Sequence, residues 1–245
     1  MKVMKELILT EARMFLREPV AVFFTLLFPF IPFLLFGTMY GHHEAMPGFR
    51  VIDFHVPAIV AMVIGYLGLM SIPIALSQYR EEGVLKRFRA SPLSLGRFLV
   101  AHIFVQLVLF VIVAAAVVIV GELVFDVRFA GSPALVALAG LLSILCMFTM
   151  GFALIGFFRG PRTAQAGSAF VFFLMLFTSG AAMPRRDFPP WLQEVTDLVP
   201  LAHVVDTVTT AWVGLPASDE VGSYVTLAVL TVVCFVVAKL TFRWQ

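Results

Sequence analysis

The chain has 245 residues, of which 61% are hydrophobic and only 13% are charged, and 26 of them are phenylalanine. A soluble domain of this composition would expose far too much apolar surface, so the composition excludes an ordinary water-soluble protein and favours a membrane protein. The net charge is only +2, and no motif supports a nucleic acid as partner.

Residues 2–18 predict an amphipathic helix that lies on the cytoplasmic face of a membrane. Apolar side chains recur at helical spacing, and charged side chains occupy the remaining arc. Pro19 then allows the chain to turn into the bilayer. About 19 residues with three acids precede an apolar run that is too long for a signal peptide, so we expect this run to stay as an anchor.

Six apolar runs are long enough to cross a membrane as helices. Because they take up more than half of the chain, no stretch of about 50 residues remains for a separate soluble domain. We therefore expect residues 1–245 to form a single all-α transmembrane domain, with a kink in its first span at Pro29 and Pro32. The six predicted spans lie near residues 20–40, 55–77, 98–121, 133–158, 165–183 and 221–242.

The basic residues are distributed unequally between the two sides of these spans. Thirteen of the 17 Lys and Arg residues lie on the side of the N-terminus, and the other side has only Arg50, Arg128, Arg185 and Arg186. The positive-inside rule then places both termini in the cytoplasm of a multi-pass protein of the bacterial inner membrane or plasma membrane. Thirteen bases and five acids give the inner side a charge of +8, which suits anionic lipid or an acidic protein partner.

Histidines and cysteines give no metal site in this sequence. The vicinal His42 and His43 of the first external loop suit no regular metal-ligand spacing, and solvated loop histidines are commoner. Cys146 and Cys234 lie within apolar spans, where a thiol behaves as a small hydrophobic group. We therefore expect neither a metal nor a disulfide.

The segment between spans two and three, residues 78–97, is the most informative short stretch. It reads QYREEGVLKRFRASPLSLGR, in which Tyr79, Leu85 and Phe88 share one helical face among charged residues. A positive-inside loop with a surface helix would carry the same charges. Charge alone therefore does not identify this segment as a docking helix.

The external segment 183–220 is long but not polar. Its apolar residues form two helical stripes separated by Pro200, which predicts short amphipathic helices over 189–199 and 201–212. Both are too short to cross a membrane, so we expect re-entrant or interfacial helices. They would serve either as an outer gate or as a cap that only anchors the last span. The candidate gate residues are Trp191, Val195, Leu198, Val205 and Trp212.

Several kinds of chemistry have no motif here. The chain contains no GxxxxGK[ST], HExxH, GxSxG or CxxC sequence, so it has no Walker loop for ATP phosphates. Three ionisable residues lie near the ends of spans, where a charged side chain reaches the membrane–water interface at little cost in free energy, namely His102, Glu122 and Lys239. A proton-coupled carrier usually needs a buried acid that binds and releases the proton, so the sequence does not favour this class of protein.

The order of the parts resembles the membrane subunit of an ABC-2 type transporter. One group of residues is similar to the family's charged-Gly-x-Leu-x-x-Leu-x-x-x-Pro stretch, namely Arg80, Glu81, Glu82, Gly83, Val84, Leu85, Phe88 and Pro92. A second group is similar to its Ser-Gly, Pro, Leu-Pro-x-Trp-Leu, Pro-Leu pattern, namely Ser179, Gly180, Pro184, Phe188, Pro189, Pro190, Trp191, Leu192, Pro200 and Leu201. Lys86 departs from the first pattern, since many relatives carry an acid there.

This resemblance implies a transport subunit, not an enzyme, with ATP and Mg bound by a separate ABC ATP-binding subunit and no cofactor in this chain. Two permease subunits, identical or related, would pair in the lipid bilayer and export an amphipathic drug, a lipid or a lipid-linked glycan. A helix within 78–89 would couple them to the ATPase through Tyr79, Arg80, Glu81, Glu82, Gly83, Leu85, Arg87 and Phe88. The candidate pathway or dimer face consists of Phe28, Phe33, Phe170, Phe173 and Phe177.

Two other classes remain as alternatives. A secondary carrier or channel would need no ATPase, and copurification with one separates these classes from a permease. A membrane-embedded enzyme would need convergent acids, histidines or a metal. The histidines at 42, 43, 55 and 203 do not form such a set.

Overall fold

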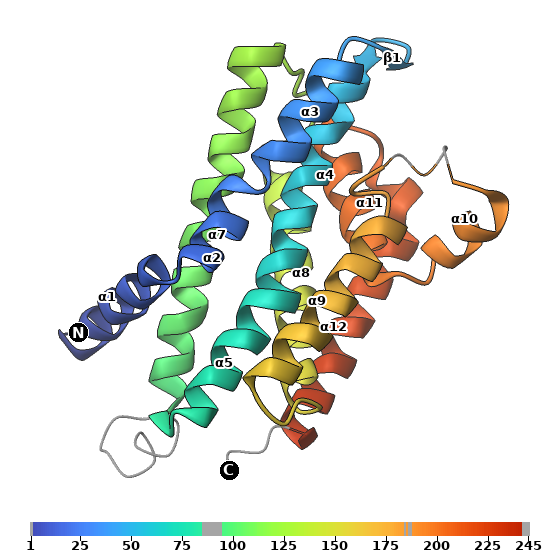
Figure 1. Cartoon of the computed structure of the whole chain (residues 1–245). Helices are drawn as coiled ribbons and strands as arrows, with labels where there is room; N and C mark the ends of the chain where they lie inside the picture. The colour runs from blue at the N-terminus through green and yellow to red at the C-terminus, as the bar shows by residue number, and fades with distance from the viewer. Residues whose placement is uncertain (1, 85–94, 184, 186–187, 242–245) are drawn as a thin grey trace.

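The computed structural model describes residues 2–84, 95–183, 185 and 188–241, which form a bundle of long helices (Figure 1). The predicted coupling residues Leu85, Arg87 and Phe88 lie outside the described residues. Within these residues, five helical segments are long and apolar enough to cross a membrane, which confirms the predicted class of a mostly helical membrane protein. These segments are Pro19–Tyr40, Val51–Glu81, Gly96–Phe125, Pro133–Ile155 and Ala217–Thr241.

The N-terminal part contains the predicted helix and an irregular first span. Helix α1 (Lys2–Arg17) is followed by α2 (Pro19–Val22), a π-helix η1 (Phe23–Leu27) and α3 (Phe30–Tyr40). Between η1 and α3 the chain turns at Phe28 and Pro29, because proline cannot donate the next helical hydrogen bond. The predicted interruption is therefore present at Pro29, whereas Pro32 lies within α3.

The second span is one long helix with a π-turn in its middle. Helices α4 (Val51–Tyr66), η2 (Leu67–Ser71) and α5 (Ile72–Glu81) follow one another directly, so the span extends beyond the predicted 55–77. It crosses α8 (Pro133–Ile155) so closely that a Cβ atom on Gly151 would lie 2.0 Å from the carbonyl oxygen of Gly68. Glycine at 151 is thus a steric requirement of this crossing.

The remaining helices complete the bundle and carry the predicted outer helices. These are α7 (Leu95–Phe125), α9 (Pro161–Thr178), α10 (Pro190–Thr196), α11 (Pro200–Val213), the 3-10 turn η4 (Ala217–Glu220) and α12 (Val221–Thr241). Helix α9 corresponds to the fifth predicted span, but its first turns are polar, and it is not among the five segments. The fifth span, and with it the total of six, therefore remains a prediction.

One end of the bundle carries a small β-hairpin, which the sequence did not predict. Strands β1 (Glu44–Met46) and β2 (Phe49–Arg50) pair antiparallel, and Gly48 between them has a φ of 85°. We call this the hairpin end, and we call the opposite end, where α5 stops, the α5 end (Figure 1). At the hairpin end the fully buried Asp53 accepts hydrogen bonds from the backbone N–H groups of Arg50 at 2.7 Å and Arg128 at 2.8 Å. These bonds fix the start of α4 to the connection between α7 and α8.

Candidate functional site

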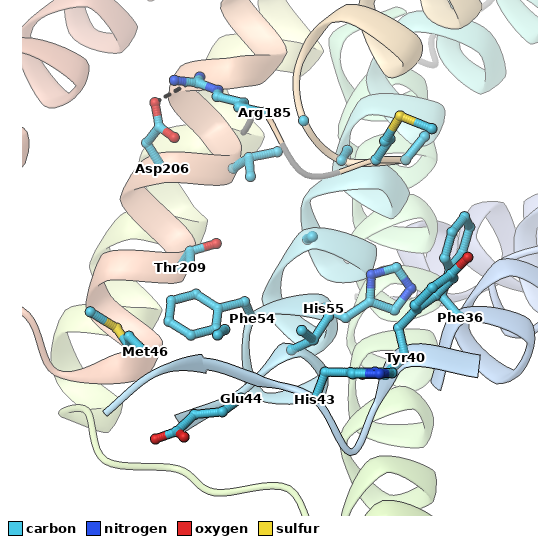
Figure 2. A pocket seen from close by; sticks show the side chains of 18 residues that line it. Phe36, Tyr40, His43, Glu44, Met46, Phe54, His55, Arg185, Asp206 and Thr209 are labelled. Atoms are coloured by element: carbon cyan, nitrogen blue, oxygen red, sulfur yellow. Dashed lines mark hydrogen bonds and ion pairs between the residues drawn. The ribbon is translucent and has the colours of Figure 1, made fainter. Parts of the chain in front are cut away.

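A pocket of about 910 Å³ opens at the hairpin end of the bundle (Figure 2). Helix α3, the hairpin, helix α4, the segment after α9 and helix α11 all contribute to its wall, which is mainly apolar. Helix α11 can form one wall because it is part of the core, packed against α4, α8 and α12. The predicted gate residue Val205 lies in this wall.

Aromatic rings form one side of the pocket. The ring of Phe36 lies 5.5 Å from that of His55 and 6.1 Å from that of Tyr40, and all three residues line the pocket together with Phe54 (Figure 2). Behind them, the fully buried Phe33 stacks on His55 at 6.2 Å. Phe33, a candidate for the pathway or dimer face, thus supports the wall from within the core and is not exposed.

Two buried polar atoms in the pocket wall have no partner among the described residues. They are Nε2 of His55 and Oγ1 of Thr209, on α4 and α11. A buried polar atom without a hydrogen bond costs free energy on the order of 1–3 kcal/mol. Both atoms are covered by the protein, although the two residues line the pocket, so a molecule in the pocket reaches them only if the wall rearranges locally.

An ion pair closes the side of the pocket formed by the segment after α9. Nη2 of Arg185 lies 2.9 Å from Oδ2 of Asp206 on α11, and Nη1 lies 3.7 Å from Asp197. Burial raises the pKa of Asp206 to about 6, although the positive charge of Arg185 acts in the opposite direction. Gly180, with a φ of 89°, permits the turn that brings Arg185 to this position.

The pocket has the size and lining of a binding site for one drug-sized amphipathic molecule. Such sites have volumes of roughly 300–1,000 Å³ and consist of apolar and aromatic walls with a few polar groups. Among the described residues of the wall, none forms a nucleophile held by a base. Within the described ranges, no three His, Cys, Asp or Glu side chains are grouped to hold a metal ion. The geometry thus favours binding of an organic molecule over catalysis.

The predicted coupling residues that the structure describes lie at the α5 end. Tyr79 is buried, Arg80 donates a hydrogen bond to the carbonyl oxygen of Phe158, and Glu81 and Glu82 are exposed. Gly83 follows α5 with a φ of 70°, and a Cβ atom there would meet no atom of the described residues within 4 Å. Backbone conformation therefore favours glycine at this position. Whether these residues couple to an ATPase stays a prediction.

The other predicted residues lie in several environments. Phe170 and Phe177 on α9 are exposed, whereas Phe28 and Phe173 are half-buried. Trp212 is buried against Phe129, with the ring centroids 4.8 Å apart. Trp191, Val195 and Leu198, on or just after the peripheral helix α10, are exposed. Of the predicted site residues that the structure describes, Val205 lines the pocket and Phe33 supports its wall.

The sequence predicted that His102 lies at the membrane–water interface, where a polar side chain costs little free energy. The structure shows a buried position instead. His102 is only 4% exposed, and its Nδ1 lies 2.8 Å from the carboxylate of Glu11 on α1. The signal was present, because Glu11 lies one turn from Leu7 and Phe15, on the apolar side of the amphipathic helix. A carboxylate on that side requires a partner from the protein.

Known proteins match the chain over most of its length. The sequence model of one family, described as ABC-2 type transporter, matches residues 3–213. The chain is 28% identical over 156 residues to the "Probable multidrug ABC transporter permease YbhR" of Escherichia coli (strain K12), which covers 62% of this chain and 42% of that protein. It is 24% identical over 234 residues to the "Daunorubicin resistance ABC transporter permease protein DrrB1" of Streptomyces coeruleorubidus, which covers 92% of this chain and 79% of that protein. The matched part thus spans less than half the length of YbhR.

Proposed function

The chain belongs to the ABC-2 type transporter family, and on this premise we propose that it is the permease subunit of an exporter for an amphipathic molecule. As a member of this family it is a membrane transport subunit without an ATPase site of its own. ATP is bound and hydrolysed, with Mg, by a separate ABC subunit, and a drug, a lipid or a lipid-linked glycan leaves the cytoplasm.

The pocket at the hairpin end is the observation that carries this proposal. Its aromatic wall and the few polar residues of its lining, such as Glu44, Asp206 and Thr209, suit a molecule with a large apolar part and a few polar groups. The name of one similar protein includes daunorubicin resistance, and an aromatic, partly polar drug is compatible with such a wall. A drug is therefore the first substrate class to test.

The proposed arrangement in the membrane follows from the distribution of charge. With the positive-inside rule, the α5 end faces the cytoplasm and the pocket faces outward. In this orientation α9 also crosses the membrane, which makes six spans, and both termini are cytoplasmic. Helices α10 and α11 lie on the outer side, and α1 and the end of α5 meet the ATPase. A second permease subunit, identical or related, completes the pathway in the cell membrane.

The test is ATP-driven transport by the purified complex. The chain is co-expressed with its ATP-binding subunit, and uptake of daunorubicin into inside-out proteoliposomes is measured with and without ATP. We expect ATP-dependent uptake that Phe54→Ala reduces, because it removes a ring from the pocket wall. Phe235→Ala on the exposed face of α12 is the matched control and should transport normally. Uptake driven by an ion gradient without ATP, or purification with no ATP-binding subunit, would favour a carrier or channel.

A further inference from the structure

A cluster of buried polar side chains joins three helices toward the α5 end, away from the pocket. Its centre is the carboxylate of Glu11 on α1, which is 4% exposed. Oε2 of Glu11 accepts a hydrogen bond from the hydroxyl of Tyr79 at 3.0 Å and lies 2.8 Å from Nδ1 of His102. A single oxygen atom therefore holds α1, the last turns of α5 and the first turns of α7 together.

The cluster continues from α7 to the π-turn in the middle of the second span. One helical turn after His102, the side-chain amide of Gln106 donates a hydrogen bond to the hydroxyl of Ser71 at 2.7 Å. Ser71 is the last residue of η2. The polar contacts thus lead from the N-terminal helix α1 to η2, the π-turn of the second span. Another part of the same span, α4, lines the pocket.

These side chains are held at a cost in stability. Oε1 of Glu11 and Oε1 of Gln106 are buried and have no hydrogen-bond partner in the described part of the chain. Unpaired buried acceptors are unfavourable, and apolar residues of similar volume often replace buried ionic groups without loss of stability. A role in fixing the relative position of the helices accounts for the cluster better than a role in stability.

Polar contacts fix position in a way that apolar contacts between helices do not. A hydrogen bond weakens steeply when its distance or angle changes, whereas apolar surfaces are non-directional and can slide past one another. The ring of Tyr79 is further held between those of Phe98 at 5.1 Å and His102 at 6.1 Å. On its other side, α5 is bound to the turn after α8 through the bond from Arg80 to Phe158.

We propose that Glu11 is a positioning residue that locks α1, the end of α5 and the start of α7 into one unit, so that force applied by the ATP-binding subunit moves all three together. The proposal rests on the proposed function, since it requires an ATPase that acts at the α5 end. Without the lock, α1 moves separately from α7, and ATP-driven movement no longer reaches the second span in full.

The test measures the distance between α1 and α7 directly and needs no knowledge of the substrate. Spin labels are placed at the exposed positions Thr10 and Val100 of the full complex, in a background without Cys146 and Cys234. Distance distributions are recorded without nucleotide and with ATP and vanadate. In the wild type we expect a single narrow distribution that stays the same in both states.

The two test variants are Glu11→Gln, which removes the charge at constant volume, and Tyr79→Phe, which removes only one hydroxyl. Loss of a charge-assisted hydrogen bond shifts the ratio of separated to locked arrangements on the order of tenfold, so a second or broader distance population should appear with ATP. Because both variants change contacts of the same oxygen atom, the second distance population in the double variant should be only slightly larger than in Glu11→Gln. Glu6→Gln, on the exposed side of α1, and Tyr224→Phe on α12 are matched controls and should behave as the wild type.

The possible outcomes separate this inference from the proposed function. Unchanged distances in both variants, even with a lower temperature of unfolding, would mean that the cluster only stabilises the fold, and the lock would be disproved. A wild type in which α1 moves relative to α7 with ATP would disprove it as well. If no ATP-binding subunit joins the complex, the proposed function fails, and the lock fails with it. If the complex hydrolyses ATP but the distances in the variants equal those of the wild type, only the lock fails.

Discussion

The charge of Asp206 should make the stability of the hairpin end depend on pH. Burial raises the pKa of Asp206 to about 6 from an ordinary value of 3.8, against the opposing effect of Arg185 and with smaller contributions from Glu220 and Asp197. A carboxyl group with a raised pKa in the folded protein contributes stability fully below about 3.8 and loses it as pH rises through about 6. The relevant window is thus pH 4–6.

The size of the effect follows from the difference between the two pKa values. A difference of about two units corresponds to a free energy of unfolding of up to about 3 kcal/mol. The Asp206 side chain is 21% exposed, so solvent reduces this to on the order of 1–2 kcal/mol. For a chain of this length, such a change shifts the temperature of unfolding by roughly 2–8 °C.

The assay compares the wild type with Asp206→Asn, which keeps the shape of the side chain and removes its titration. Unfolding temperatures of the detergent-solubilised proteins are measured in steps from pH 4 to pH 7.5. We expect the wild-type value minus the variant value to fall as pH rises through the window. The exposed Asp219→Asn is the control and should show a constant difference. A constant or rising difference for Asp206→Asn would refute the reasoning.

Three further predictions concern other positions. Gly83→Leu should lower the free energy of unfolding by about 1–2 kcal/mol, because Gly83 has a φ of 70°, and should reduce transport-coupled ATP hydrolysis. Gly83→Asn should retain more activity, because Asn tolerates this conformation. Equal activities of the two variants would contradict a conformational role. Val205→Asp should lower the yield of assembled complex in size-exclusion chromatography, because Val205 is 9% exposed and burying an unpaired charge costs free energy. Val195 is 42% exposed, so Val195→Asp should assemble normally. Gly151→Ala should lower the yield of monodisperse protein, since its Cβ would lie 2.0 Å from the oxygen of Gly68; a normal yield would show that the crossing can widen.

The helices could be predicted from the sequence because hydropathy alone marks them. Their ends could not. Gln78 to Glu81 are as polar as a loop but continue the helix of the second span, and at its other end the charged Asp53 interrupts the apolar run although the helix already begins at Val51. The hairpin was missed because its strands have only three and two residues and show no alternating pattern. Helix α9 was predicted as a span from its apolar second half, and its polar first turns leave that role open.

The pocket could be predicted only in part, because its wall comes from three separate regions of the chain, residues 36–58, 180–185 and 205–209. Apolar periodicity marked Val205 as part of an apolar stripe. The stripe is buried in the structure because α11 packs against three other helices. The same reasoning gave Trp191 and Leu198 equal weight, although α10 is a short helix at the edge of the bundle. Periodicity shows which side of a helix is apolar, but it does not show whether another helix covers that side.

The second span connects the pocket to the polar cluster. His55 lines the pocket and Tyr79 binds Glu11, and both belong to the same continuous helix, about 36 Å apart at 1.5 Å per residue. Between them, the close crossing at Gly68 holds the middle of this helix against α8. A helix that is fixed near its middle and displaced at one end must also reposition its other end, unless it bends at the π-turn. The polar contact from Ser71 to Gln106 opposes such a bend, because it ties the end of that turn to α7. Breaking the Glu11 lock and breaking the Ser71 contact should therefore both reduce communication between the two ends, the first at its origin and the second midway along the helix.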